Sequence, residues 1–504
     1  MVLNRAPSEK IKYWERKLAA LLAHIPPVDL LKLSWALEAL RSGNDARARI
    51  HLNFPETSDE HQIGAKYFIP PWNIDGVINE RFNLKPESRN GKQLNLRNWG
   101  GVAKLFNTYN GLANIESVKD FKQGGILAAM PRLLWPQYDW QLGFDNIFRV
   151  GRAWHVYATP EGKEAFRVKH SIDLDRFLKV AFAMFAETQD YPAVKYSFIR
   201  SIGVSNQEIH LVRNVIGKTI EEHFNFAESI RDKAIPIDFR QSITKERPLF
   251  EAQNGNDPMV FIPFRSHLLL RITDGLYYDI VHDGDARRSS GERFEELCKM
   301  LLSHYLPESY SVEGERDTSY GKSADIFAFE RGGDFGAVFE CKIRRLPLRI
   351  LTSPDPWRDY EKDFDDVVKG IVQVWRTHNE LLSSDETCFV GFIILFDPWT
   401  AMGNSFIQEL FNKATAKADA LSIPSCSRIN VALVDYADFE RCLRSYEFSD
   451  ICRAARLTVK DDYHGYLLSG VLEANFNKTE KKPRFNYSKL AEEAVPWWGE
   501  IQQN

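Results

Sequence analysis

The sequence predicts an α/β protein in which a mixed-sheet domain follows a large, mainly helical region. Two observations support this fold class. Apolar residues recur at spacings of three and four through much of residues 1–245, as in amphipathic helices. From about residue 291, short apolar runs alternate with helical segments, which indicates a sheet covered by helices.

The C-terminal part has a clear predicted order of elements. Two of its strands form a hairpin, whereas others are joined by helical crossovers, so the predicted sheet is mixed. The order is a helix at 292–305, strands near 310–316, 324–330 and 336–343, a helix near 363–382, a strand at 389–396, a helix near 405–420 and a strand at 429–434.

We divide the chain into four predicted parts. The strand-like runs RPLFEAQ, PMVFIPF and GLYYDIV predict a β-rich connector before the α/β domain. The polar stretch HDGDARRSSG that follows them predicts the domain boundary. The parts are a mainly helical N-terminal region at 1–245, the connector at 246–285, the α/β domain at 286–455 and a C-terminal tail at 456–504.

Composition restricts the class of protein. The 504 residues are 44% hydrophobic and 27% charged, as in ordinary soluble proteins, and no apolar run approaches the length of a membrane span. The N-terminus lacks the apolar core of a signal peptide, so we expect a cytoplasmic protein. The six cysteines contain no CxxC pair, which argues against zinc knuckles and a disulfide framework. With a net charge of −4, any nucleic-acid site must be a local patch.

The stretch GAVFECKIRRL places a glutamate and a lysine at the end of an apolar run. If the preceding Gly332-Gly333 is a two-residue hairpin loop, Asp325 lies opposite Glu340, and Lys342 shares their face. Opposed carboxylates repel and raise each other's pKa unless a cation joins them. A divalent metal would join them best. The alternative is a surface hairpin with a simple Glu–Lys pair.

The helix at 292–305 offers a further carboxylate. Glu295 lies at the edge of its apolar stripe, whereas Glu292 and Glu296 point away from it. Glu295 is therefore the glutamate best placed to reach inward, although an ordinary boundary residue has the same spacing. The stripe consists of Phe294, Leu297, Cys298, Leu301, Leu302 and Tyr305.

Cations gather on two segments, namely the end of the strand at 336–343 with the residues just after it, and the helix that follows. Lys369, Gln373 and Arg376 share one polar face of the helix at 363–382. This face could meet a phosphate backbone or could simply be solvated. Four cations also follow Glu340 closely in the chain, namely Lys342, Arg344, Arg345 and Arg349.

Together these residues resemble the PD-(D/E)XK nuclease superfamily, over roughly residues 291–396. The family order of a helix, three strands, a helix and a strand matches the predicted order. The matching residues are Glu295 in RFEELCKMLL, Asp325 in KSADIFAFE, Glu340 and Lys342 in VFECK, and Gln373 in KGIVQVW. One departure is Ala324, which stands where the family often has proline.

The resemblance implies a metal-dependent phosphodiesterase. Asp325, Glu340 and the backbone carbonyl of Cys341 would bind Mg²⁺ or Mn²⁺, and Lys342 would orient the attacking water. Glu295 would support a second metal or its water shell. The residues implied in phosphate or nucleic-acid binding are Gln373, Lys369, Arg344, Arg345 and Arg349.

The expected activity is that of a DNA endonuclease acting on double-stranded DNA. The N-terminal region would recognise a target, a trigger or a partner chain. The partners considered besides nucleic acid are a partner protein subunit and further copies of the chain in a homo-oligomer. Large regions fused to such nucleases occur in bacterial restriction and anti-phage defence proteins, so a defence role is a hypothesis by analogy. The alternatives are an RNA-cutting or structure-specific nuclease, and a catalytically silent nucleic-acid-binding or assembly protein.

Overall fold

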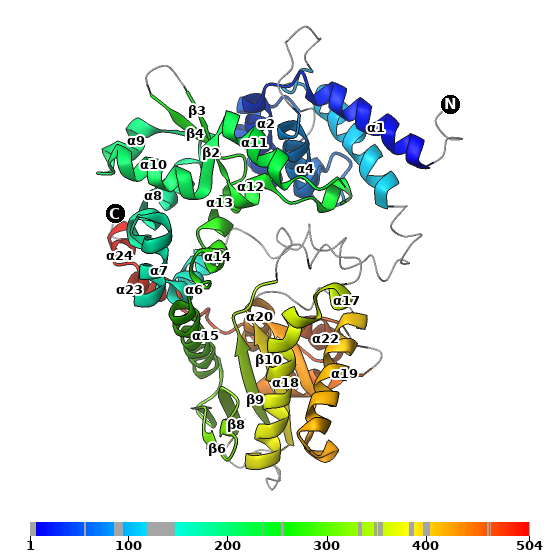
Figure 1. Ribbon diagram of the computed structural model, residues 1–504, viewed down its shortest axis with the longest axis vertical. Coiled ribbons are helices and arrows are strands. Elements are labelled where there is room, and N and C mark those ends of the chain that lie inside the picture. The colour runs from blue at the N-terminus through cyan, green and yellow to red at the C-terminus, as the bar shows by residue number, and fades with distance from the viewer. Residues whose placement is uncertain are drawn as a thin grey trace.

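The protein is described by a computed structural model in which helices and a mixed sheet form two lobes (Figure 1). The predicted α/β class is confirmed. In the described residues, no helix is both long enough and apolar enough to cross a membrane. The described ranges are 7–54, 57–84, 94–117, 147–233, 235–253, 257–330, 335–346, 350, 356–382, 388–396, 404–460, 463 and 465–502.

The first lobe is mainly helical, as predicted, and contains a small sheet with the strand order β1-β4-β3-β2. Its strands are β1 (Ala193–Lys195), β2 (Gly217–Thr219), β3 (Leu249–Ala252) and β4 (Met259–Phe261). Its helices are α1 (Pro7–Leu22), α2 (Pro27–Arg41), α3 (Asp45–His51), α4 (Pro71–Phe82), a helix over 99–117, α6 (Ile147–Tyr157), α7 (Pro160–His170), α8 (Leu174–Glu187), α9 (Tyr196–Ser201), α10 (Asn206–Ile216), α11 (Ile220–Ile230) and α12 (Ile243–Glu246).

The predicted β-rich connector at 246–285 is only partly correct. RPLFEAQ and PMVFIPF contain β3 and β4, but GLYYDIV is helical. Buried ion pairs explain the difference. Asp279 pairs with Arg271 at 2.6 Å and with His170 at 2.9 Å, so remote contacts outweigh the β-propensity of the run. The segment consists of α13 (Arg265–Arg271), a 3-10 turn (Asp274–Leu276) and α14 (Tyr277–Ile280).

The second lobe is built on a five-stranded sheet with the order β11-β10-β9-β8-β5. β9, β10 and β11 are parallel, whereas β5, β8 and β9 are antiparallel, so the sheet is mixed as predicted. Its strands are β5 (Tyr310–Gly314), β8 (Ile326–Glu330), β9 (Phe335–Lys342), β10 (Cys388–Leu395) and β11 (Val431–Asp435), and a separate hairpin is formed by β6 (Asp317–Thr318) and β7 (Gly321–Lys322).

Helices cover both faces of this sheet. α15 (Gly284–Tyr305), α20 (Tyr436–Ser445) and α21 (Phe448–Leu457) share a hydrophobic core with one face. α18 (Asp365–Thr377), which continues into a π-helical turn (His378–Leu382), packs on the other face with α19 (Asn404–Ala420), and a short α17 (Pro356–Tyr360) precedes α18. Figure 1 shows α18 and α19 side by side in front of the sheet.

The hairpin register is the one predicted from the sequence. Ile326 pairs with Phe339 and Ala328 pairs with Ala337. Phe327 and Val338 pack in the core beneath α18, whereas Ile326 and Phe339 pack on the opposite face. The Gly332-Gly333 loop itself lies outside the described residues.

α15 begins at Gly284 and not at residue 292, so the polar stretch at 282–291 is not a break between elements. Asp283 explains the earlier start, because its side chain accepts hydrogen bonds from the N–H groups of Asp285 and Ala286 and so caps the helix. The helix contacts α6 and α7 in the first lobe and β5 and β9 in the second. One continuous helix therefore belongs to both lobes.

The C-terminal tail returns to the first lobe, where Figure 1 shows its red end beside α7. Within the predicted C-terminal tail, residues 477–486 are mostly exposed, and helices lie on either side of them. Trp498 packs edge-on against Trp154 of α6, with ring centroids 5.4 Å apart. One hydrophobic core runs from Val150 to Trp498, and the four predicted domain ranges stay a prediction. The helices are α22 (Leu468–Asn475), α23 (Tyr487–Ala494) and α24 (Trp497–Gln502).

Trp498→Ala should lower the free energy of unfolding of the first lobe by about 3–5 kcal/mol, the usual cost of truncating a buried tryptophan. Trp498 is 4% exposed, whereas Tyr466, which is 61% exposed, provides the control substitution Tyr466→Ala. Chemical denaturation followed by tryptophan fluorescence and circular dichroism measures the change. Equal stability of the two variants would contradict the packing described here.

Candidate active site

Asp325 and Glu340 lie where the β8–β9 ladder ends. The last pair of the ladder is Ile326 with Phe339, so the next residue on each strand is one of these carboxylates. Both side chains are on the face covered by α18, because side chains alternate along a strand. Asp325 Oδ2 accepts a hydrogen bond of 2.6 Å from the N–H of Cys341, which holds the carboxylate beside β9.

The Glu340 carboxylate is buried, and only one of its two oxygens has a hydrogen-bond donor in the described part of the chain. The side chain of Lys342 donates to Glu340 Oε1 at 2.5 Å. The other oxygen, Oε2, is buried and has no hydrogen-bond partner among the described residues. Burial, followed by the nearby charge of Asp325, raises the pKa of Glu340 to about 8. A buried carboxylate oxygen without a donor is costly, so this position favours a proton or a cation.

Asp325 and Lys342 lie close enough to Glu340 for their charges to act on it. Burial raises the pKa of Asp325, although Lys342 and the Cys341 N–H oppose the rise. Burial alone would lower the pKa of Lys342, but the carboxylates of Glu340 and Asp325 outweigh it and raise that pKa. Lys342 therefore remains a cation, and about a quarter of its side chain is exposed.

Glu295 reaches the same group of charges from α15. It is half-buried, whereas Glu292 and Glu296 are exposed, in agreement with the helical wheel. Burial, followed by the charge of Asp325, raises the pKa of Glu295 to about 7, while Lys342 opposes the rise. α15 packs on the face opposite α18, so Glu295 interacts with Asp325 and Lys342 from the other side of the sheet.

The donor set fits a hard divalent cation that takes its remaining ligands from solvent or substrate. Within the described ranges, no group of three or more His, Cys, Asp and Glu side chains could hold a metal by itself. Mg²⁺, however, is commonly bound by one or two carboxylates together with water and phosphate. Asp325 and Glu340 supply those carboxylates. The Cys341 carbonyl points to the same side of β9 as its N–H, which is the side of Asp325.

α18 holds the segment that precedes Asp325. The Gln373 side-chain amide donates to the carbonyls of Lys322 at 2.7 Å and Ser323 at 2.9 Å. The Thr377 hydroxyl accepts a 2.8 Å hydrogen bond from the N–H of Ala324. Gln373 was expected at a phosphate, but here its amide N–H groups bind the backbone. Sequence reasoning missed Thr377, although it lies four residues after Gln373 on the same helical face.

α18 also presses against the two charged side chains of β9. A Cβ added at Gly370 would lie 3.1 Å from Glu340 Cγ and 3.4 Å from Lys342 Cε. The absence of a side chain at Gly370 therefore allows the helix to approach the site closely.

The predicted phosphate-binding cations have protein partners in this structure. Arg344 donates to Asp366 at 2.7 Å and to Asp363 at 2.8 Å. Lys369 is 3.6 Å from Asp366, and the Arg345 guanidinium lies 5.9 Å from the centre of the Tyr278 ring. Arg349 lies outside the described residues.

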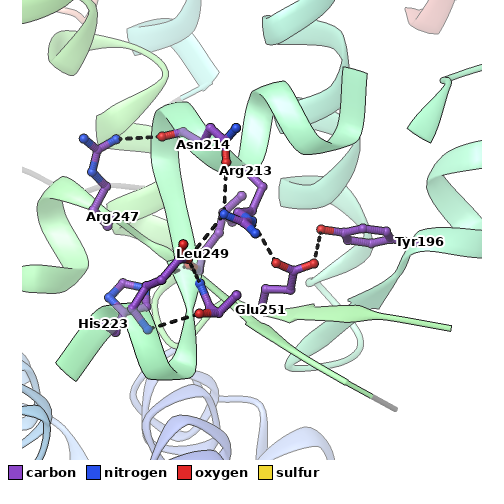
Figure 2. Close-up of polar contacts among 9 residues, drawn as sticks. Tyr196, Arg213, Asn214, His223, Arg247, Leu249 and Glu251 are labelled. Carbon is purple, nitrogen blue, oxygen red and sulfur yellow. Dashed lines mark hydrogen bonds and ion pairs between the residues drawn. The ribbon is translucent and has the colours of Figure 1, made fainter. Parts of the chain in front are cut away.

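A second buried polar cluster lies in the first lobe (Figure 2). Glu251 accepts from the Tyr196 hydroxyl at 2.8 Å and pairs with Arg213 at 2.7 Å, so both of its oxygens have partners. His223 hydrogen-bonds the carbonyl of Leu249, and burial lowers its pKa to about 3. Because Arg213 neutralises Glu251, this cluster joins α10 and α11 to β3. The second Glu251 oxygen faces the Arg213 guanidinium, whereas Lys342 contacts the other Glu340 oxygen, Oε1.

Comparison with family models, with curated proteins and with solved structures gave no match to this chain.

Thr377→Val should lower the free energy of unfolding by about 1–3 kcal/mol, because it leaves the buried N–H of Ala324 without an acceptor while nearly preserving shape. Thr377→Ser keeps the hydroxyl and serves as the matched control. Denaturant titration of both variants measures the effect. A valine variant as stable as the serine variant would show that this hydrogen bond does not stabilise the segment before Asp325.

The raised pKa of Glu340 predicts a pH-dependent stability in EDTA. The folded state keeps a proton up to about pH 8, whereas the unfolded chain loses it near 4.5. This contribution to stability is therefore complete below about pH 4.5 and is lost as the pH rises through 8. Glu340→Gln should remove this pH-dependent loss of stability. The free energy of unfolding of the variant, relative to that of the wild type, should therefore rise by a few kcal/mol between about pH 5 and 8.5.

Thermal and denaturant unfolding at several pH values test this dependence. Glu292→Gln is the control, because Glu292 is exposed on the same lobe. A constant difference between Glu340→Gln and wild type across the pH range would show that Glu340 has an ordinary pKa.

Proposed function

We propose that the second lobe is a metal-dependent nuclease of the PD-(D/E)XK superfamily that hydrolyses phosphodiester bonds. The single observation that carries the proposal is the buried Glu340 oxygen without a partner, next to Asp325 and Lys342. The buried Glu251 carboxylate, by contrast, faces the Tyr196 hydroxyl with one oxygen and the Arg213 guanidinium with the other. Glu340 instead retains a free ligand position where two strands bring acidic side chains together.

The arrangement of elements supports the same proposal. α15, β5, β8, β9, α18 and β10 follow one another in the superfamily order. The acidic residues and the lysine occur on the elements where the superfamily pattern has them. The catalytic lysine candidate lies two residues after the ligand glutamate on one strand, so both side chains face α18.

Each residue has a proposed task in hydrolysis. Asp325, Glu340 and the Cys341 carbonyl would hold Mg²⁺ or Mn²⁺. When bound, this ion lowers the pKa of water and stabilises charge on the phosphate. Lys342 stays protonated, so its ammonium can orient a water molecule and neutralise an oxygen of the substrate. Glu295 would hold the water shell of a second cation.

We further propose double-stranded DNA as substrate, with endonucleolytic cutting in a bacterial defence setting and a recognition role for the first lobe. Support comes from the architecture, in which a large helical region precedes the site and shares α15 with it. The described cysteines are free thiols, and Cys298, Cys341, Cys442 and Cys452 are buried, which suits the proposed cytoplasmic location.

Purified protein should cut plasmid DNA with Mg²⁺ or Mn²⁺ and should not cut it with EDTA. Asp325→Ala and Lys342→Ala should each lower the cleavage rate at least about 100-fold, because each removes charge stabilisation at the reacting phosphate. Gel assays of plasmid, linear DNA, single-stranded DNA and RNA measure the rates. The control is Lys478→Ala, because Lys478 is an exposed lysine paired with Glu473.

The possible results separate the candidate functions. Metal-dependent cutting that survives Asp325→Ala or Lys342→Ala would contradict the assigned site. Tight binding of nucleic acid without cutting of any substrate would favour the silent binding protein. Preferential cutting of RNA would replace DNA as the proposed substrate and leave the site assignment intact.

A further inference from the structure

An exposed tyrosine stands on the β6–β7 hairpin, close in the chain to the candidate active site. Tyr320 is 70% exposed, so most of its side chain is open to solvent. It lies in the turn between Thr318 and Gly321, and these two residues form a pair of the short ladder. Sequence reasoning placed no element here, because the strands of this hairpin are only two residues long.

The turn that carries Tyr320 is held by several hydrogen bonds. The Thr318 hydroxyl donates to the Gly321 carbonyl at 2.8 Å and accepts from the N–H of Tyr320 at 3.3 Å. The N–H of Ser319 donates to the carboxylate of Glu380. Gly321 has a φ of +109°, which favours glycine and closes the turn. The ring is therefore presented on an ordered support and not on a loose loop.

One face of the ring is already covered by a cation. The Arg376 guanidinium lies 4.7 Å from the centre of the Tyr320 ring. In the part of the chain that the structure describes, no carboxylate pairs with Arg376. The pair therefore combines an aromatic surface with a positive charge available to an anion. Proteins that bind single-stranded nucleic acid commonly use this combination, because bases stack on aromatic rings and phosphates are neutralised by cations.

The hairpin is attached firmly to the segment that leads to Asp325. Gln373 binds the carbonyls of Lys322 and Ser323, and Arg376 lies three residues further along α18. Tyr320 precedes Asp325 by five residues, which limits the separation of their Cα atoms to about 18 Å. Because the two side chains extend this distance, a base on Tyr320 would lie within several nucleotides of a phosphate at Asp325.

We propose that Tyr320 and Arg376 form a stacking platform for an unpaired base within several nucleotides of the cleaved phosphate. This inference rests on the proposed nuclease function and narrows its substrate class. The preferred substrate then contains a single-stranded stretch, an overhang or a flap beside the cut. A fully paired blunt duplex offers no free base face to the ring.

The test measures binding by the full-length chain in the Lys342→Ala background, so that the probe is not cut. The probes are fluorescein-labelled DNA as a single strand, a blunt duplex and a duplex with an overhang, followed by anisotropy. Tyr320→Ala should weaken single-strand and overhang binding about 5- to 150-fold, the usual value of one stacked base. Tyr320→Phe keeps the ring and should bind within about twofold of the parent.

The control variant is Tyr466→Ala, which removes another exposed tyrosine and should bind like the parent. Unchanged single-strand binding by Tyr320→Ala would overturn the platform, whereas metal-dependent cutting by the wild type would still support the nuclease. An equal loss for blunt duplex and single strand would also overturn the platform. If the wild type neither binds nor cuts any probe, the proposed function fails and the platform fails with it.

Discussion

The pairing of β8 with β9 is the constraint on which the candidate site depends. Ile326 and Phe339 are buried opposite each other, and this apolar pair forces the next residues, Asp325 and Glu340, onto the other face at the ladder's end. Burial raises the pKa of both carboxyl groups, and the charge of Asp325 raises that of Glu340 further. Hydrophobic packing of the strands therefore holds acidic groups where burial disfavours their charged forms, and such groups are common at functional sites.

Features of this site that depend on local periodicity were predictable from the sequence. The Gly-Gly turn and strand alternation give the register of Asp325 and Glu340, and the helical wheel selects Glu295 from three glutamates. Features that depend on remote partners were not predictable. GLYYDIV has strand-like composition, but the partners that bury Asp279 in a helix include His170 of α7, over a hundred positions away in the chain.

The same limit applies to side-chain roles. Spacing shows that Gln373 lies on a polar face, but it cannot show that the amide binds the backbone before Asp325. Arg344 and Arg345, which follow Lys342, were interpreted as phosphate contacts. Arg344, however, already forms ion pairs with Asp363 and Asp366. Charge patterns in the sequence therefore indicate where charged side chains gather. Only the tertiary structure shows which of those side chains are already paired with an opposite charge.

The return of the C-terminus to α6 has a consequence for how the protein is made. The helices around Trp154 are synthesised before the sheet of the second lobe, whereas Trp497 and Trp498, which complete their core, are synthesised after it. The charged group at β9 is translated between these two events. A chain interrupted after the sheet would contain every proposed catalytic residue, yet its first lobe would remain unfinished. The core of the first lobe is therefore completed only by residues that follow the whole sheet of the second lobe in the chain.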